Sequence, residues 1–547
     1  MIHSSKQKMI YREAAWVVVV ASIVFALSQI PYSAADRHTP KGEMFLGQVA
    51  LADDVNSYYS FIRQAAQGHW VFRNTMTYID HAPVFVNIEW LALGKCMRWF
   101  GWSPRTTFDA WRVAGVFMLL GAFAALAHVS LRSELHRRAA LMMCAIGGGF
   151  GWLLALLMQA GVMHAPDGPD MLNPALDLFA GIQPFVQLTR NPHFSLPHGT
   201  FILMCMFMII GENTRNPRWY AVAALSALIH GLIRPYDLIS LFVMIPVFVA
   251  TESAVARRLD LRWAAVRCLP LAVAAPVLLY YVYIFSVHPV FRFWASQGDQ
   301  PFVPLHWHLL SLGIAFPLFA YRIARWRAQP LASPGERFLA VWAVVILLLF
   351  HSYKFVPFMP YTPQLGVPLM TPLILLGVTV LPGVRTSARA VTIAALLISL
   401  NALSTPVYLR RELHNAPREG HLYIRNVDLD AVDWANRNIK ESGVVLARYA
   451  VGTQISQFLN ARVAVGHWAL SPHVETLNPR INHLLSGELA PEDAHILIDE
   501  IQPRFLYVDL PESRADTAYL AALGFRSVYE NSGVRMYENT TKPVLTD

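Results

Sequence analysis

Two adjacent carboxylates, Asp53 and Asp54, stand directly after the first strongly apolar segment of the chain. Residues 52–83, which begin with this pair, read ADDVNSYYSFIRQAAQGHWVFRNTMTYIDHAP. An unpaired charge beside a lipid bilayer is costly, so two acids at this place need a partner or a function. Partial loss of water raises the pKa of a carboxyl group and makes its carboxylate a better proton acceptor. The pair is therefore a candidate general base for deprotonating a hydroxyl group.

A purely structural role is the alternative for these acids. An Asp is favourable as the N-cap or in the first turn of the helical pattern that follows. Capping accounts for one of the two acids more easily than for both. If one acid is the base, the second has three candidate roles: orienting the acceptor, tuning the first by charge coupling, or binding a divalent metal such as Mg²⁺ or Mn²⁺. A metal site at Asp53 or Asp54 stays an open question.

The composition is that of a protein embedded in a membrane. The chain has 547 residues, of which 55% are hydrophobic and 15% charged, whereas soluble domains carry about 25% charged residues. The net charge of +8 comes from cations in short loops between apolar runs, so no nucleic-acid partner is indicated. None of the cysteines forms a CxxC pair, so neither a disulfide framework nor a zinc site is indicated. They are Cys96, Cys144, Cys205 and Cys268.

Eleven apolar segments are candidates to cross a bilayer, which takes roughly 20 residues. They are residues 14–32, 108–128, 139–161, 199–212, 219–233, 236–251, 263–286, 308–321, 338–351, 367–382 and 390–408. Cations gather in every second loop, which places the N-terminus in the cytoplasm and the C-terminus on the outer face. The pattern predicts a mainly α-helical, multi-pass protein of a bacterial-type inner (plasma) membrane.

Two regions outside the spans carry most of the polar sequence. The first outward loop, residues 33–107, holds the Asp pair, and residues 1–408 as a whole are expected to form the transmembrane domain. Residues 409–547 alternate short apolar runs with helical patterns, which predicts a small soluble α/β domain on the outer face. Its strand-like runs are Val444–Ala447, Arg462–Val465, Arg504–Val508 and Phe525–Tyr529, and Asn531-Ser-Gly suggests a closing hairpin.

The first outward loop resembles the corresponding loop of the GT-C superfamily, which comprises polytopic glycosyltransferases such as the protein O-mannosyltransferases and the aminoarabinose transferase of lipid A. The resemblance covers about 60 residues. It rests on Asp53-Asp54, Tyr58-Tyr59, Gly68-His69-Trp70, His81-Ala82-Pro83, Phe100-Gly101 and Arg112. Many members have a basic residue and two prolines where this chain has His81-Ala82-Pro83. No WWDYG-like motif occurs in the C-terminal region, which disfavours an oligosaccharyltransferase.

The resemblance implies an enzyme that moves a sugar from a polyprenyl-phosphate-linked donor to an acceptor hydroxyl at the outer face, with inversion. One of the two acids, Asp53 or Asp54, would be the general base. The acceptor is a glycan, a lipid or a protein. The alternatives are a transporter or flippase of lipid-linked saccharides and a scaffolding protein of the cell envelope. A transporter would show mid-span charges and inverted repeats, and neither is visible in the sequence.

Other residues are candidates for binding the donor and the acceptor. A leaving phosphate needs cations at the outer ends of the spans, and the candidates are Arg234, Lys354, His351 and Arg292. Snorkelling to the lipid headgroups is the alternative for Arg234 and Lys354, and Arg234 also has Asp237 as a candidate partner. The candidates for lining the acceptor cavity are Tyr58, Tyr59, His81, His193 and His198. A structured loop is the favoured role for the last two, because their spacing is poor for a metal site.

Overall fold

The computed structural model describes residues 2–164, 175–179, 181–296, 304–352, 362–381, 387–415, 420–439, 443–510 and 516–541. The chain forms two compact units. Unit 1 comprises Met1–Pro31, Asp109–Val282 and Gly298–His414, and unit 2 comprises Tyr32–Phe108, Tyr283–Gln297 and Asn415–Asp547. The domain boundary expected after residue 408 stays a prediction.

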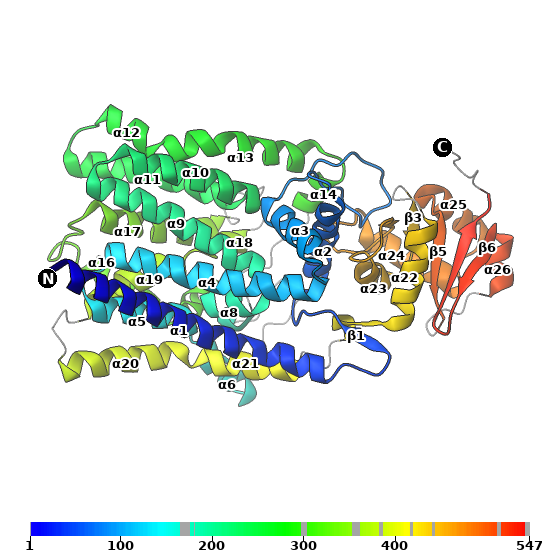
Figure 1. Ribbon diagram of the computed structural model, residues 1–547, viewed down its shortest axis with the longest axis horizontal. Coiled ribbons are helices and arrows are strands. Elements are labelled where there is room, and N and C mark those ends of the chain that lie inside the picture. Colours follow the sequence, from blue (N-terminus) through cyan, green and yellow to red (C-terminus); the bar gives the residue numbers. More distant parts are fainter. Residues whose placement is uncertain are drawn as a thin grey trace. The chain divides into compact units, whose positions relative to one another are not determined.

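The secondary structure of unit 1 consists of helices alone within its described residues. Within it, α9 packs against α10 and α17, and α16 packs against α19 (Figure 1). The helices that lie wholly or mostly in this unit are α1 (Ile2–Arg37), α4 (Pro104–Ser130), α5 (Glu134–Ile146), α6 (Gly151–Gln159), α7 (Leu176–Phe179), α8 (Pro184–Arg190), α9 (Pro192–Thr214), α10 (Pro217–Ile233), α11 (Asp237–Ala256), α12 (Leu261–Arg267), α13 (Leu269–Val287), α15 (Leu305–Ser311), α16 (Ala315–Ala324), α17 (Pro334–Phe350), α18 (Thr362–Leu365), α19 (Met370–Gly377), η2 (Val378–Val380), α20 (Ala388–Ala402) and α21 (Ser404–Asn415).

The described helices are those of a multi-pass membrane protein. Six are long and apolar enough to cross a bilayer, and two bent pairs, α5 with α6 and α15 with α16, raise the number to eight. The six are Tyr11–Arg37, Pro104–Ser130, Pro192–Thr214, Asp237–Ala256, Leu269–Val287 and Ala388–Asn415. The count of eleven also includes the segments of shorter helices such as α10, α17 and α19, and it stays a prediction.

The break between α5 and α6 contains the glycines Gly147–Gly149. The Gly149 N–H donates to Asp177 Oδ2 at 2.7 Å, and the Gly148 N–H donates to the Asn401 oxygen at 2.6 Å. A Cβ atom on Gly149 would collide with the backbone oxygen of Ser311. The segment therefore needs glycine because neighbouring backbone and side-chain atoms approach it closely.

Replacing Gly149 by Ala will destabilise unit 1 by about 1–3 kcal/mol, because a backbone oxygen cannot move aside as a side chain can. Gly121 in α4 is the matched control, since a Cβ there meets nothing within 4 Å. Gly121→Ala should leave the thermal midpoint unchanged or raise it, since Ala favours a helix over Gly by about 1 kcal/mol. The thermal unfolding midpoints of the two purified variants test this, and equal midpoints would contradict it.

Unit 2 contains a small mixed sheet. Its strand order is β4-β3-β5-β7-β6, with β3 parallel to β4 and β5, and with β7 antiparallel to β5 and β6. The strands are β3 (Val444–Leu446), β4 (Arg462–Val463), β5 (Phe505–Asp509), β6 (Phe525–Glu530) and β7 (Val534–Asn539). Each strand-like run of the sequence overlaps one of these strands, and Asn531 lies in the predicted hairpin turn between β6 and β7.

Helices of the C-terminal segment pack against this sheet, and other helices of unit 2 lie in the first outward loop. Two apolar clusters fill the unit, one built around Leu446, Ile481 and Leu506 and the other around Val445, Val463 and Tyr507. The helices are α2 (Ala52–Gln67), α3 (Ile88–Phe100), α14 (Phe291–Ser296), η4 (Gly420–Leu422), α22 (Asn426–Asn438), α23 (Tyr449–Ile455), α24 (Val474–Ser486), α25 (Pro491–Ile501) and α26 (Thr517–Ala522).

Backbone pairing joins the first outward loop to the C-terminal segment within unit 2. Strand β1 (Glu43–Phe45) pairs antiparallel with β2 (Tyr423–Arg425). The Val463 N–H donates to the Thr75 oxygen at 2.8 Å, and Arg63 donates to Asn460 Oδ1 at 2.6 Å. These bonds hold α2 beside α23, with which it packs, and so determine where the Asp pair lies.

Candidate active site

The two carboxylates lie in the first turn of α2. Asp53 and Asp54 follow Ala52, the first helical residue, and Leu51 is the N-cap. Leu51 has φ 56° and ψ 42°, a left-handed conformation that costs a non-glycine residue about 1–2 kcal/mol, and it makes no side-chain capping bond. The partial positive charge of the helix N-terminus favours both carboxylates. The acids are therefore first-turn residues rather than caps, and the strained Leu51 marks where α2 begins.

Asp53 is held by a tyrosine from the C-terminal segment. The hydroxyl of Tyr449, the first residue of α23, donates to Asp53 Oδ2 at 2.6 Å. Burial and the neighbouring Asp53 carboxylate raise the pKa of Tyr449. The tyrosine therefore stays protonated at physiological pH and remains a hydrogen-bond donor to Asp53.

Asp54 is held by a histidine with one defined tautomer. His467 Nδ1 accepts the backbone N–H groups of Ala469 and Leu470 at 3.0 and 3.3 Å. A backbone N–H can only donate, so Nδ1 carries no proton and the ring proton is on Nε2. His467 Nε2 therefore donates to Asp54 Oδ1 at 3.1 Å. Ser471 Oγ fixes the turn by accepting the His467 N–H at 3.0 Å.

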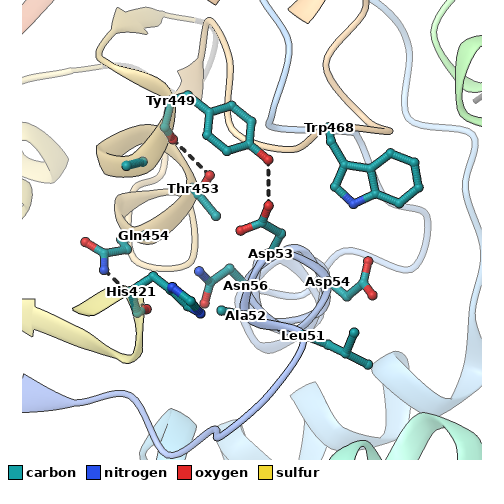
Figure 2. Close-up of a pocket in the computed structure, with 11 residues that line it drawn as sticks. Leu51, Ala52, Asp53, Asp54, Asn56, His421, Tyr449, Thr453, Gln454 and Trp468 are labelled. Atoms are coloured by element: carbon teal, nitrogen blue, oxygen red, sulfur yellow. Dashed lines mark hydrogen bonds between the residues drawn. The ribbon is translucent and has the colours of Figure 1, made fainter. Parts of the chain in front are cut away.

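Both acids line one pocket of about 450 Å³. Figure 2 shows Asp53 pointing towards Tyr449 and Asp54 pointing to another side of α2. Trp468, which follows His467, is 45% exposed and lies against this pocket. The lining residues are Leu51, Ala52, Asp53, Asp54, Asn56, His421, Tyr449, Ala450, Thr453, Gln454 and Trp468.

A buried amide lies in the wall of the pocket. Asn56 Oδ1 accepts hydrogen bonds from Gln48 Nε2 at 2.9 Å and Gln457 Nε2 at 3.0 Å. Asn56 is fully buried, and its Nδ2 has no hydrogen-bond partner within the described parts of the chain. A buried donor of this kind is costly unless a ligand or water accepts from it.

The described residues do not fit a metal centre. In the ranges that the structure covers, no group of three His, Cys, Asp or Glu side chains could hold a metal ion. Asp53 and Asp54 point to different sides of α2, and each accepts a hydrogen bond from its own partner. No step of the chemistry below is therefore assigned to a metal.

Two residues expected to line the acceptor cavity, Tyr58 and Tyr59, and one expected to bind the donor, Arg292, lie elsewhere in unit 2. The ring of Tyr58 stacks on Trp90 with centroids 5.2 Å apart, and the Tyr59 hydroxyl donates to the Pro104 oxygen at 2.8 Å. Arg292 is exposed on α14. None of these three residues lines the pocket of the acids.

His81 is a buried structural residue in this structure. Its Nδ1 donates to the Ile79 oxygen at 3.0 Å, and its Nε2 accepts the Asn74 N–H at 3.1 Å. Burial lowers the pKa of His81 to about 4. The ring is therefore neutral at physiological pH, and both of its nitrogens are engaged by the backbone.

Unit 2 will lose stability as the pH falls, because protonation of His81 puts a second donor against the Asn74 N–H. The folded-state pKa of His81, about 4, lies below the ordinary value of 6.5. Neutral His81 therefore contributes fully to the free energy of unfolding above pH 6.5, and this contribution is lost as the pH falls towards 4. The full loss is about 3 kcal/mol at 1.36 kcal/mol per pKa unit. Thermal melts of the wild type and of His81→Gln across this window test it. Identical pH dependence in the two proteins would show that His81 does not contribute.

The other sequence-predicted residues belong to unit 1. Arg234 is fully buried, and its Nε lies 3.0 Å from Asp237 Oδ2. His198 bonds through its ring to Gln187 and Thr371, and His193 lies beside Trp111. His351 Nε2 lies 2.9 Å from His308 Nδ1, and Lys354 is outside the described residues.

Reasoning from sequence missed the residues that hold the acids. Tyr449 follows β3, and His467 and Trp468 follow β4, its parallel neighbour. The carboxyl ends of parallel strands meet at one edge of a sheet, where ligands commonly bind. Polar and aromatic residues directly after two adjacent strand-like runs could therefore have indicated that Tyr449, His467 and Trp468 belong to the site.

No family model and no curated protein matches the sequence. Solved structures do match. The apo oligosaccharyltransferase of Archaeoglobus fulgidus gives a TM-score of 0.56 at 12% identity, over 96% of this chain and 74% of the other. The same enzyme in complex with Zn and sulfate gives 0.51 at 12% identity, over 95% and 73%.

The chain has the GT-C fold. This is the fold that the resemblance of the first outward loop implies, and it agrees with a mainly helical, multi-pass chain that carries a small C-terminal sheet. A further GT-C structure, ArnT from Cupriavidus metallidurans bound to undecaprenyl phosphate, gives a TM-score of 0.48 at 14% identity, over 96% of this chain and 98% of the other. Identities this low describe the fold, and the activity is argued separately from the site.

Proposed function

We propose that this chain is a glycosyltransferase that moves a sugar from a polyprenyl-phosphate-linked donor to an acceptor hydroxyl at the outer face of a bacterial-type inner membrane. One observation carries the proposal. Two carboxylates in the first turn of α2 line one pocket, and each accepts a hydrogen bond from a different side chain of the C-terminal segment. The GT-C fold and the loop resemblance support the donor class.

The reaction needs a base for the acceptor hydroxyl. The hydroxyl oxygen bonds to the anomeric carbon while the bond from that carbon to the phosphate oxygen breaks. The pair of electrons leaves with the polyprenyl phosphate, the hydroxyl proton passes to the base, and a single displacement inverts the anomeric carbon. A carboxylate can take this proton only on an oxygen that is open to the acceptor.

We assign the base to Asp54. The short bond from the Tyr449 hydroxyl fixes Asp53 in place and occupies one of its two oxygens. The bond from His467 to Asp54 is longer, at 3.1 Å against 2.6 Å, so Asp54 is held less tightly. Asp54 is also 30% exposed on the side chain. Asp53 then orients the acceptor hydroxyl.

The leaving phosphate needs positive charge. Arg292, which is exposed on α14, and Lys354 are proposed to supply it. Arg234 and His351 have protein partners in unit 1, as described above, and their part in donor binding stays a prediction. The same holds for the eleven spans and for the orientation with the N-terminus in the cytoplasm.

The buried pair of Arg234 and Asp237 in unit 1 does not favour the transporter alternative. Arg234 is the C-cap of α10, and Asp237 is the first residue of α11. These charges therefore lie at helix ends rather than in the middle of a span, where a substrate path would need them.

Sugar transfer by the purified protein tests the proposal. Proteoliposomes of the wild type and of the double variant Asp53→Asn/Asp54→Asn are supplied with polyprenyl-phosphate sugars and candidate acceptors, and the products are weighed by mass spectrometry. The wild type should form a glycosidic bond that the double variant does not form. Envelope glycans of cells with and without the protein should differ by the same sugar. Unchanged glycans and an inert wild type would overturn the proposal, and uptake of substrate without bond formation would favour a transporter.

A further inference from the structure

The pocket of the two acids carries an aromatic surface. Trp468 lines it with 45% of its surface exposed. The indole stacks on the ring of His467, with centroids 5.7 Å apart and planes inclined by 23°. His467 is itself fixed by three hydrogen bonds through its two ring nitrogens, as described above. The indole therefore presents a flat apolar surface beside two carboxylates (Figure 2), and the His467 ring supports it by stacking.

The electrostatic character of the pocket disfavours anionic ligands. Two lining residues are carboxylates, and none of the described lining residues is Lys or Arg. Two like charges about 4 Å apart near a protein surface repel by about 4 kcal/mol. A phosphate or carboxylate group is therefore disfavoured in this pocket, and the leaving phosphate of the donor must be bound elsewhere.

The hydrogen-bonding groups of the pocket suit a ligand rich in hydroxyls. Each carboxylate accepts a side-chain bond on one oxygen, so within the described structure the second oxygen remains to accept from a hydroxyl. Asn56 Nδ2 is a buried donor without a partner in the described residues. Donors and acceptors next to one aromatic surface match a sugar ring, whose hydroxyls lie at its edge and whose C–H groups form an apolar face.

The lining is poorly suited to a peptide. Its residues come from α2, η4, α23 and the segment after β4, and none belongs to a strand. Main-chain pairing of an extended peptide with an open strand edge, one of the common modes of peptide binding, is therefore not offered by these residues. The volume of about 450 Å³ lies in the range of small-molecule sites, roughly 300–1,000 Å³.

We infer that this pocket binds a neutral saccharide, with Trp468 as its stacking platform and Asn56 Nδ2 as a donor to one of its oxygens. The inference rests on the proposed function in one respect: the bound saccharide is the acceptor, and its hydroxyl faces Asp54. The acceptor is then the uncharged end of a glycan rather than a protein or a phosphorylated headgroup.

Saturation-transfer NMR on the full-length protein in lipid nanodiscs tests the binding without any donor. The probes are maltose, lactose and mannobiose, a Ser/Thr-containing peptide, and inorganic phosphate as a competitor. At least one disaccharide should bind through its C–H face and should not be displaced by phosphate. Trp468→Ala should weaken binding roughly three- to tenfold, and Trp468→Phe should weaken it less.

Two further variants separate stacking from hydrogen bonding. Trp70 is 67% exposed in unit 2 but does not line the pocket, so Trp70→Ala is the matched control and should bind like the wild type. Asn56→Asp keeps the oxygen that accepts from Gln48 and Gln457 but replaces the unpartnered donor by an acceptor, so binding should fall.

The inference and the proposed function fail in different ways. Saccharide binding that depends on Trp468, without sugar transfer, would support the site and overturn the activity. Sugar transfer without saccharide binding would overturn the inference alone. Equal effects of Trp468→Ala and Trp70→Ala would overturn it too, as would binding of the peptide in place of every disaccharide.

Discussion

Asp54→Asn will lower kcat for sugar transfer by about 10²–10⁴-fold, the range that a general base contributes. The amide keeps the size of the carboxylate and its bond from His467 Nε2, but it has no lone pair basic enough to take the acceptor proton. Asp53→Asn should lower kcat about tenfold, because that side chain only orients the acceptor. A tenfold change corresponds to one lost interaction of about 1.4 kcal/mol.

The two substitutions are matched controls for each other. Both remove a negative charge from the first turn of α2, where each charge contributes about 0.3–1 kcal/mol through the helix dipole. Their thermal midpoints should therefore agree, and any difference in kcat reflects the chemistry. Single-turnover transfer rates with saturating acceptor make the comparison. A larger loss of kcat for Asp53→Asn would assign the base to Asp53 and the orienting role to Asp54. Equal small losses for the two variants would show that neither acid is the base.

Arg234→Met will destabilise unit 1 by about 3–5 kcal/mol, the usual cost of leaving one member of a buried ion pair alone. Arg234 and Asp237 are 0% and 2% exposed, and the guanidinium also donates to the Gln364 oxygen and Oε1 at 3.0 and 3.1 Å. His230 Nε2, 3.3 Å from Asp237 Oδ2, is the remaining partner of that carboxylate. The loss should therefore appear as a lower unfolding midpoint.

A double-mutant cycle separates this structural role from donor binding. Arg234→Met/Asp237→Leu removes both charges, so it should recover much of the stability that either single variant loses. If Arg234 instead binds the lipid phosphate, Arg234→Met will raise KM for the donor with little effect on stability, and the double variant will not recover. Unfolding midpoints and donor KM for all four proteins decide between the two roles.

Local patterns were enough to predict the secondary structure of the C-terminal region. The run Val444–Ala447 is apolar and begins with two valines, and Phe525–Tyr529 contains Phe, Val and Tyr, which favour strands. Strands β3 and β6 lie within or over these runs. Asn531, whose side chain accepts the N–H groups of Gly533 and Val534, sets the turn between β6 and β7. Such features depend on residues a few positions apart, so the sequence shows them directly.

Partners that are far apart in the chain were not predictable in the same way. His81 has the residue type of a site ligand, but backbone groups of Ile79 and Asn74 engage both of its nitrogens. Arg234 has the residue type of a phosphate ligand, and of its candidate roles the structure displays the pairing with Asp237. In both places burial determined the partners of the side chain, because a buried polar group must form hydrogen bonds with groups near it.

The sequence by itself determined that the chain crosses a membrane many times, that two acids follow the first span, and that their loop resembles the GT-C pattern. Those conclusions rest on composition and on spacing within short windows. Only the tertiary structure decided that Tyr449 holds Asp53 and that His467 holds Asp54, across 396 and 413 residues. The physical reason is that strand pairing and core packing of unit 2 bring these side chains to α2, and no local pattern encodes that approach.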